Sequence, residues 1–342
     1  MLTGVMLDFL MVLLSALTGL TVARKTAPAI GLLDKPNARK VHDGHVPLVG
    51  GISVWIALCA VQMLNPGWLD AQPVFWLCLS LLLVVGVIDD RFNLPVLPRI
   101  VAQALTAVLM MYSGNMLWTL GEVLPGYVVA LGAFGYLFTL VAIWASINAF
   151  NMIDGIDGLL GAVSCVTFTA LAGFFYQHER HGEGQWSLAL VLALLPYLAA
   201  NLGLFGGKKR KVFMGDAGST VIGFAAIWLL VVATQSGQPV MAPVTALWLI
   251  ALPLADLGAV CLRRLRARVS PFRPDRGHIH HIVMKCGFSA RQTLGILFLS
   301  AGACAGAGAV FELVGMPDWI SLTLFLAAFA GWYRFSSRVF HR

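Results

Sequence analysis

The stretch PVFWLCLSLLLVVGVI occupies residues 73–88 and is followed at once by Asp89 and Asp90. It is continuously apolar, so it lacks the alternation that marks a strand of a membrane barrel. A segment surrounded by lipid must satisfy its backbone hydrogen bonds internally, which a single α-helix does. The stretch therefore predicts a membrane-spanning helix that is followed by two adjacent acids.

The composition extends this prediction to the whole chain. Hydrophobic residues make up 59% of the 342 residues and charged residues only 11%, whereas soluble domains carry about 25% charged residues. Apolar runs recur at 2–22, 47–64, 73–88, 100–120, 125–147, 159–177, 186–205, 219–235, 243–261, 293–315 and 318–334. The sequence thus predicts an all-α polytopic membrane protein with about 11 transmembrane helices, forming one domain over residues 1–342.

The basic residues predict the orientation of these helices. If the N-terminus is periplasmic and the runs alternate, every Lys and Arg except Arg180 falls in or beside an inner loop or in the tail after residue 335. Such a bias indicates the cytoplasmic side, so the C-terminus is predicted to be cytoplasmic. The first run lacks a basic leader and its first cation is Arg24, which favours a retained span over a cleaved signal peptide. The predicted inner loops are 23–46, 89–99, 148–158, 206–218 and 262–292.

The net charge of +7 therefore does not indicate a nucleic-acid partner. Two interpretations of the basic residues stay open. Either they only set the topology and contact anionic lipid, or some of them also bind substrate phosphates. The same side of the predicted membrane also carries carboxylates, which lie at the ends of separate predicted helices.

Asp89 and Asp90 are the first of these carboxylates. Two adjacent acids at a membrane boundary are unfavourable unless a metal ion or nearby cations neutralise them. The alternative is that they end the helix in water, but acids at a helix C-terminus oppose the macrodipole.

The segment NAFNMIDGIDGL covers residues 148–159. It contains Asn148 and Asn151, and Asp154 and Asp157, each pair three residues apart. On a helix such pairs share one face, whereas Gly155 and Gly158 permit a bent backbone that approaches a ligand closely. Oxygen ligands of this kind suit Mg²⁺; the alternative is an ordinary polar turn.

The segment KKRKVFMGDAGST covers residues 208–220. It places Asp216 as a candidate metal ligand near the start of the next helix, where free N–H groups favour phosphate. Phe213 could stack on a base or pack at the membrane interface.

The segment SPFRPDRGHIHHI covers residues 270–282. Its three histidines, His278, His280 and His281, could bind Zn²⁺, but no fourth ligand is obvious in the sequence. A site for a pyrophosphate or for sugar hydroxyls fits this basic cluster better, and a solvated loop is the remaining alternative.

Five ordered motifs make the chain resemble a known family. They are GLLDKPNARKVHDGHVPLVGG (31–51), DDRFNLPVLPR (89–99), NAFNMIDGIDGL (148–159), KVFMGDAGST (211–220) and RGHIHH (276–281). Together they are similar, over nearly the whole chain, to the polyprenyl-phosphate N-acetylhexosamine-1-phosphate transferases. The HIHH form resembles the N-acetylglucosamine branch, and HVPLVGG at 45–51 differs from the TPTMGG that is typical of the peptidoglycan branch.

The resemblance implies roles for individual residues. Asp89 and Asp90 would be catalytic, acting on the lipid phosphate. Asn151 and Asp216 would hold Mg²⁺ or Mn²⁺, with Asp154 beside the metal and the pyrophosphate. The residues implied in substrate binding are Gly155, Asp157 and Phe213 at the uridine, Arg276, His278, His280 and His281 at the donor phosphates and sugar, and Asn201.

The activity implied by the resemblance is transfer of GlcNAc-1-phosphate from UDP-GlcNAc to undecaprenyl phosphate, giving undecaprenyl-diphosphate-GlcNAc and UMP. It would be the first membrane step of an O-antigen or enterobacterial common antigen type of glycan, at the bacterial inner membrane with the site facing the cytoplasm. Another UDP-HexNAc donor, a covalent aspartyl-phosphate route and a homodimer stay open.

Two other classes of protein also fit part of the sequence. A secondary transporter would explain the many spans, but transporters place ionisable groups near the midplane, where only Asp256 is a candidate. A non-catalytic scaffold could use Gly302 and Gly306 to pack helices, but this would leave the acidic motifs unexplained.

Overall fold

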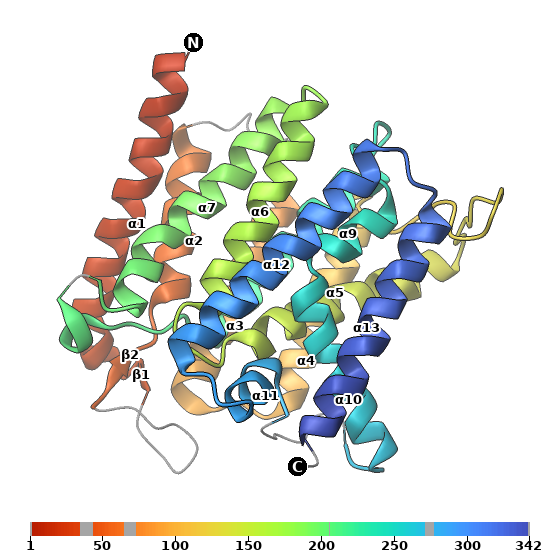
Figure 1. The fold of residues 1–342 in the computed structure, drawn as a ribbon. Helices are drawn as coiled ribbons and strands as arrows, with labels where there is room; N and C mark the ends of the chain where they lie inside the picture. The colour runs from red at the N-terminus through yellow and green to blue at the C-terminus, as the bar shows by residue number, and fades with distance from the viewer. Residues whose placement is uncertain (1, 35–43, 65–72, 205, 271–276, 341–342) are drawn as a thin grey trace.

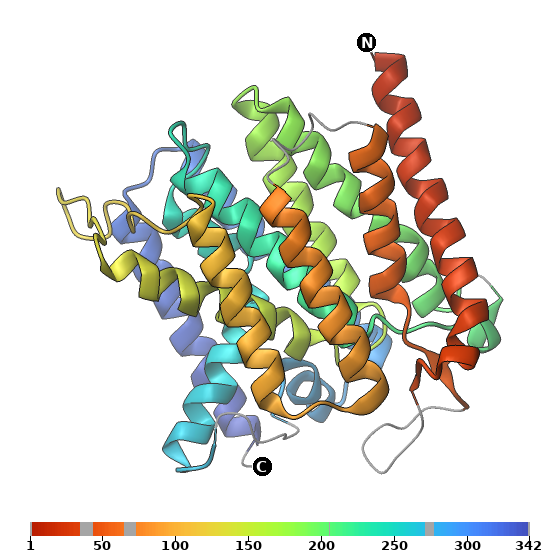
Figure 2. The ribbon, with the colours of Figure 1, turned by 180° about the vertical axis from the view of Figure 1, so that it is seen from behind.

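The computed structural model describes residues 2–34, 44–64, 73–204, 206–270 and 277–340. It is mostly helical, and Figures 1 and 2 show the long helices lying roughly side by side, with the N-terminus and the C-terminus at opposite ends of the molecule. The long helices are α1 (Leu2–Ile30), α2 (Gly50–Leu64), α3 (Pro73–Phe92), α4 (Val96–Tyr112), α5 (Phe134–Ile153), α6 (Leu159–Gln177), α7 (His181–Asn201), α8 (Gly215–Gln235), α10 (Ala251–Arg266), α12 (Ala290–Leu313) and α13 (Asp318–Phe340). The short helices are α9 (Pro243–Leu249), α11 (Ile279–Lys285) and the 3-10 helix Gly207–Arg210.

The chain is a multi-pass membrane protein. In the described residues seven helices are long and apolar enough to cross a membrane, or eight if α9 and α10 count as one bent span. α2 and α4 are shorter apolar helices. Each of the eleven predicted runs contains a helix or, at 243–261, the broken pair, but the number of spans stays a prediction.

Helix α8 lies at the centre of the bundle. It packs against α3, α5 and α2, and 89% of its apolar window is buried inside the protein. Small residues allow this close packing: a Cβ on Gly86 of α3 would overlap the backbone of Ala217, and one on Gly51 of α2 would overlap Gly218. The end of α8 that carries Asp216 is therefore fixed by three neighbouring helices.

Two predicted spans differ in their bounds from the helices of the structure. The runs 100–120 and 125–147 were expected to be helical throughout, but α4 ends at Tyr112 and α5 begins at Phe134. The segment 113–133 is instead irregular, with isolated bridges between Thr119 and Ala130 and between Leu124 and Tyr127. Four glycines of this segment have positive φ angles, which a helix cannot accommodate.

The predicted loop 89–99 is also partly helical. α3 continues past both acids to Phe92, and α4 begins at Val96. The two acids therefore lie within α3 and not at its end. Their carboxylates accept hydrogen bonds from other parts of the chain. α1, α5 and α10 likewise extend into the predicted loops 23–46, 148–158 and 262–292.

The sequence motifs collect at one end of the molecule, shown at the bottom of Figure 1 and called the motif end below. Here β1 (Leu33–Asp34) pairs antiparallel with β2 (Val46–Pro47). The chain after β2 pairs with the segment before α8, because Phe213 N–H donates to Pro47 O (2.9 Å) and Gly50 N–H donates to Phe213 O (2.9 Å). Motifs far apart in the sequence are thus joined by backbone hydrogen bonds.

Candidate active site

Asp90 connects α3 to the start of α8. Its Oδ1 accepts a hydrogen bond from Asp216 N–H (2.8 Å) and its Oδ2 accepts one from Ala217 N–H (3.2 Å). A carboxylate is favoured there because the first N–H groups of a helix lack partners and carry partial positive charge. Gly215 has φ +77°, and a Cβ on it would overlap the Asp90 carboxylate. Asp90 therefore fixes the start of α8.

Asp89 points to a different set of partners. It is 4% exposed, and its Oδ1 accepts from Leu94 N–H (2.7 Å) while its Oδ2 accepts from Arg99 Nη1 (2.9 Å). Arg99 Nη1 also lies 3.9 Å from Asp216 Oδ2. One guanidinium therefore bridges two of the predicted acids, and Arg99 is a site residue to which the sequence assigned no individual role.

Asn151 and Asp216, the two predicted metal ligands, are in direct contact. Asn151 Nδ2 donates to Asp216 Oδ1 (2.6 Å) and to Ser219 Oγ (2.8 Å). These residues open into a cavity of about 60 Å³ between α3, α4, α5 and α8. It is lined by Leu82, Val85, Gly86, Asp89, Val96, Arg99, Ile100, Ala102, Gln103, Asn148, Asn151, Asp216 and Thr220.

The loop between α5 and α6 lies beside this cavity, where Asp154 follows the last residue of α5. Asp157 Oδ2 accepts from Lys211 Nζ (2.6 Å), and the same Nζ lies 5.0 Å from the centre of the Phe213 ring. Asp157 is about half exposed. The structure thus brings together two residues predicted to bind uridine and adds Lys211 to them.

Asn201 is hydrogen-bonded to the end of this loop and to the segment before α8. Its Oδ1 accepts from Gly158 N–H (2.6 Å) and its Nδ2 donates to Val212 O (2.8 Å), and the residue is 3% exposed. Both ends of its amide are therefore bonded to backbone groups. This geometry supports the loop, whereas the sequence predicted contact with a substrate.

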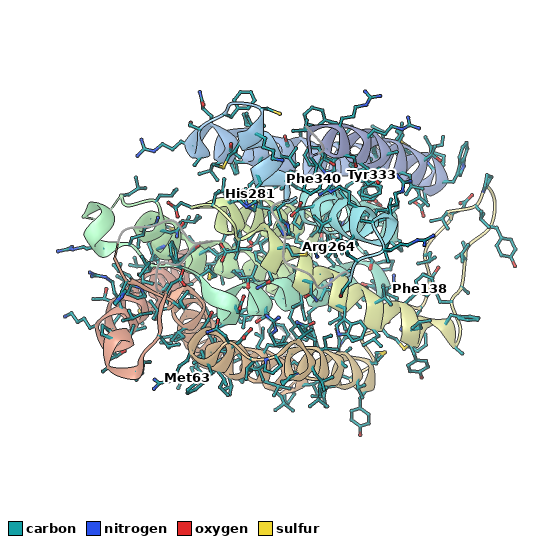
Figure 3. All side chains as sticks on the ribbon, turned by 90° about the horizontal axis from the view of Figure 1, so that it is seen from below. Met63, Phe138, Arg264, His281, Tyr333 and Phe340 are labelled. Atoms are coloured by element: carbon teal, nitrogen blue, oxygen red, sulfur yellow. The ribbon has the colours of Figure 1, made fainter. Side chains whose placement is uncertain are left out.

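The three histidines lie together at the start of α11. The ring centres of His278 and His280 are 5.8 Å apart with planes 3° from parallel, and those of His280 and His281 are 4.2 Å apart. Figure 3 views this end from below and labels His281 together with Arg264 of α10 and Tyr333 and Phe340 of α13. The fourth predicted member, Arg276, lies outside the described residues.

His280 joins this cluster to the loop after α5. A Cβ on Gly155 would overlap the His280 ring, so the absence of a side chain there lets the two motifs touch. Burial, followed by the neighbouring His281 and His278, lowers the pKa of His280 to about 3. The ring of His280 is therefore neutral at physiological pH.

The oxygen atoms in the cavity fit a hard divalent cation. In the described residues no three His, Cys, Asp or Glu side chains form a complete metal cluster. Mg²⁺, however, is commonly held by one or two protein oxygens together with water and substrate phosphates. Asp216 provides a carboxylate, and the side-chain oxygen of Asn151 accepts no hydrogen bond from any described residue. Because this oxygen remains available, the donor set fits such a cation.

Comparison with known proteins identifies the family of the chain. The sequence profile of glycosyl transferase family 4 matches residues 73–234, which run from the start of α3 almost to the end of α8. The chain is 47% identical to an undecaprenyl-phosphate alpha-N-acetylglucosaminyl 1-phosphate transferase of Yersinia pestis, over 94% of this chain and 88% of the relative.

Two further relatives carry the same name. One, from Escherichia coli K12, is 44% identical over 94% of this chain and 88% of the relative. The other, from Haemophilus influenzae, is 42% identical over 95% of this chain and 92% of the relative. The predicted resemblance is confirmed, and the chain belongs to glycosyl transferase family 4.

Proposed function

We propose that the chain transfers GlcNAc-1-phosphate from UDP-GlcNAc to undecaprenyl phosphate, releasing UMP. The names of its relatives, which match over nearly their full length, support this acceptor and this transferred group. The observation that carries the proposal is the direct contact of Asn151 with Asp216, beside the ion pair of Asp89 with Arg99. Three separate motifs thereby present oxygens and a cation to one cavity.

In the proposed reaction an oxygen of the lipid phosphate attacks the β-phosphorus of the donor. A new P–O bond forms, the bond from the β-phosphorus to the bridging oxygen breaks, and that oxygen leaves with UMP. Catalysis of this kind is mostly positioning and charge neutralisation. The second pKa of a phosphomonoester is about 6, so the acceptor is largely dianionic at neutral pH and does not depend on a protein base.

The protein residues have separate tasks in this scheme. Arg99, already paired with Asp89 and Asp216, neutralises an incoming phosphate. Phe213, Lys211 and Asp157 form the surface on which the uridine lies, with Phe213 presenting its ring to the base. Asp90 does not touch the substrates; it holds the start of α8 so that Asp216 faces the cavity.

Asn151 and Asp216 would hold Mg²⁺ or Mn²⁺, with Asp154 beside them. When bound, such an ion would supply positive charge that stabilises the departing UMP. Nearly all Lys and Arg residues fall in the predicted inner loops, and Arg99 and Lys211 lie in this site, which supports a location in the bacterial inner membrane with the motif end in the cytoplasm.

The experiment measures UMP release by the detergent-purified protein with undecaprenyl phosphate and Mg²⁺. UDP-GlcNAc, UDP-GalNAc and UDP-MurNAc-pentapeptide are tested in parallel, and Asp216→Asn is compared with Glu312→Gln. Glu312 is a suitable control because it accepts hydrogen bonds from Ala242 N–H and Thr245 at the opposite end of the molecule.

We expect release with UDP-GlcNAc alone, abolished by a chelator and by Asp216→Asn but unchanged by Glu312→Gln. Release with another UDP-HexNAc only would keep the reaction and replace the donor. Absence of metal-dependent release with every donor would refute the proposal.

A further inference from the structure

Asp256 is an acid buried inside the protein away from the cavity just described. It lies on α10 and is 1% exposed. Its Oδ1 accepts a hydrogen bond from Ile279 N–H (2.7 Å), and its Oδ2 lies 3.0 Å from His278 Nδ1. The carboxylate thus contacts two consecutive residues that follow it by more than twenty positions in the sequence.

Burial of a carboxylate is unfavourable unless hydrogen bonds compensate for the lost water. The bond from Ile279 N–H fixes the backbone at the start of α11, and an amide oxygen would accept it equally well. The contact with His278 is different, because it acts on a side chain. An ionised carboxylate only accepts hydrogen bonds, so it selects the form of the neutral imidazole that carries its proton on Nδ1.

This choice of proton position determines what the other ring nitrogen can bind. With the proton on Nδ1, Nε2 of the neutral ring is a hydrogen-bond acceptor. A phosphate oxygen has no proton to donate at neutral pH, whereas a hydroxyl or an amide N–H does. The stack of His278 on His280, and the contact of His280 with Gly155, place the His278 ring next to the loop of the candidate site.

We propose that Asp256 is a positioning residue that keeps the proton of His278 on Nδ1, so that Nε2 accepts a hydrogen bond from a hydroxyl or amide N–H group of the donor sugar. This inference rests on the proposed function, which places a UDP-sugar beside the histidines. It assigns His278 to the sugar half of the donor, whereas the sequence left the choice between sugar and phosphates open.

Asp256→Asn tests the proposal with little change in shape. The asparagine oxygen still accepts from Ile279 N–H, but its NH₂ group faces Nδ1 and moves the ring proton to Nε2. The N–H on Nε2 then faces the sugar: it cannot bond to an amide N–H, and a hydroxyl must turn a lone pair toward it and so gives up the hydrogen bond that it donated. Loss of one such hydrogen bond corresponds to roughly a tenfold change, so we expect the KM for UDP-GlcNAc to rise about tenfold. Inhibition by UMP, which lacks the sugar, should not change.

A double-mutant cycle separates this role from a structural one. If Asp256 acts through His278, adding Asp256→Asn to His278→Asn causes no further rise in the KM for UDP-GlcNAc. Effects that multiply, a parallel loss of UMP binding, or an unchanged KM in Asp256→Asn would each overturn the proposal. Glu312→Gln, an acid-to-amide change at the far end of the α9–α10 pair, is the matched control and should behave as the wild type.

A second measurement needs no variant at Asp256. In wild-type protein labelled with ¹⁵N-histidine, the signal that disappears in His278→Asn should report a proton on Nδ1; a proton on Nε2 would overturn the proposal even if Asp256→Asn fails to fold. The proposed function and the proposed role of Asp256 can be refuted separately. A wild-type protein without UMP release refutes the proposed function, whereas an active wild type with an unaffected Asp256→Asn variant refutes only this inference.

Discussion

Replacement of Asn201 by alanine tests whether this residue supports the site or touches a substrate. Its amide joins Gly158 N–H to Val212 O with bonds of 2.6 and 2.8 Å, and it is 3% exposed. Alanine would leave both backbone groups buried without a partner. Gly158 lies directly before α6 with φ +78°, so the loop that carries Asp157 would lose the bond that fixes its end.

The expected loss of stability in Asn201→Ala follows from the two hydrogen bonds. A buried polar group left unsatisfied costs about 1–3 kcal/mol, so Asn201→Ala should lower the free energy of unfolding by about 3 kcal/mol. Unfolding would be followed by tryptophan fluorescence in mixed detergent micelles. Asn115→Ala is the matched control, because Asn115 lies outside the motif end and its Nδ2 donates to a side chain, Ser113 Oγ (3.1 Å), in a part-buried pair; we expect a change below about 1 kcal/mol.

Activity measured on the same samples provides the decisive comparison. If Asn201 supports the loop, kcat/KM falls together with stability, and Asn201→Asp, which keeps only the acceptor, is impaired as well. An unchanged unfolding midpoint combined with a raised KM for UDP-GlcNAc would refute this reasoning and favour direct contact with the donor, as predicted from the sequence.

Three further predictions concern the same end of the molecule. Gly155→Ala should cost about 1–3 kcal/mol of stability and reduce UMP release, because the new methyl group would overlap the buried ring of His280; Gly173→Ala, with open space around it, should be neutral in both assays. Because the folded protein keeps His280 neutral with a pKa of about 3 against 6.5, the unfolded chain takes up a proton first as the pH falls. Stability should therefore decrease by about 1.4 kcal/mol per pH unit from roughly pH 6 downward, and His280→Asn should remove this contribution from unfolding curves measured across that range. Asp90→Ala should lower stability by about 2 kcal/mol, because two N–H groups at the start of α8 lose their acceptor, whereas Asp90→Asn, which keeps one acceptor oxygen, should lose less in the same titration.

The helices of this protein were largely predictable because lipid imposes a simple rule on sequence. A run such as 73–88 has no alternative to a helix when no water is present to satisfy its backbone. The segment 113–133 was assigned wrongly because its aromatic and aliphatic residues have the composition of a span. Hydropathy alone did not detect the glycines with positive φ that exclude a helix there.

The sequence predicted that several of these residues would lie together, but not which contacts each of them makes. Asn151 and Asp216 carry oxygens suited to one cation, and they do meet. Asp89 and Asp90 are adjacent in sequence, yet their carboxylates bind different elements, which no spacing rule reveals. Asp256 was noted only as a candidate ion site within a span, because a contact between residues 22 positions apart on different elements leaves no periodic signal.

The burial of α8 has a consequence for how the protein is made. Its apolar window is 89% covered by other parts of the chain, and its packing partners α2, α3 and α5 all precede it in the sequence. A ribosome therefore delivers these three helices before α8 itself, whereas α9, which also contacts α8, follows it. Asp90 and Asn151 have no access to the backbone and side chain of Asp216 until α8 enters its place, so these contacts form only after about two thirds of the polypeptide, through residue 235, has been synthesised.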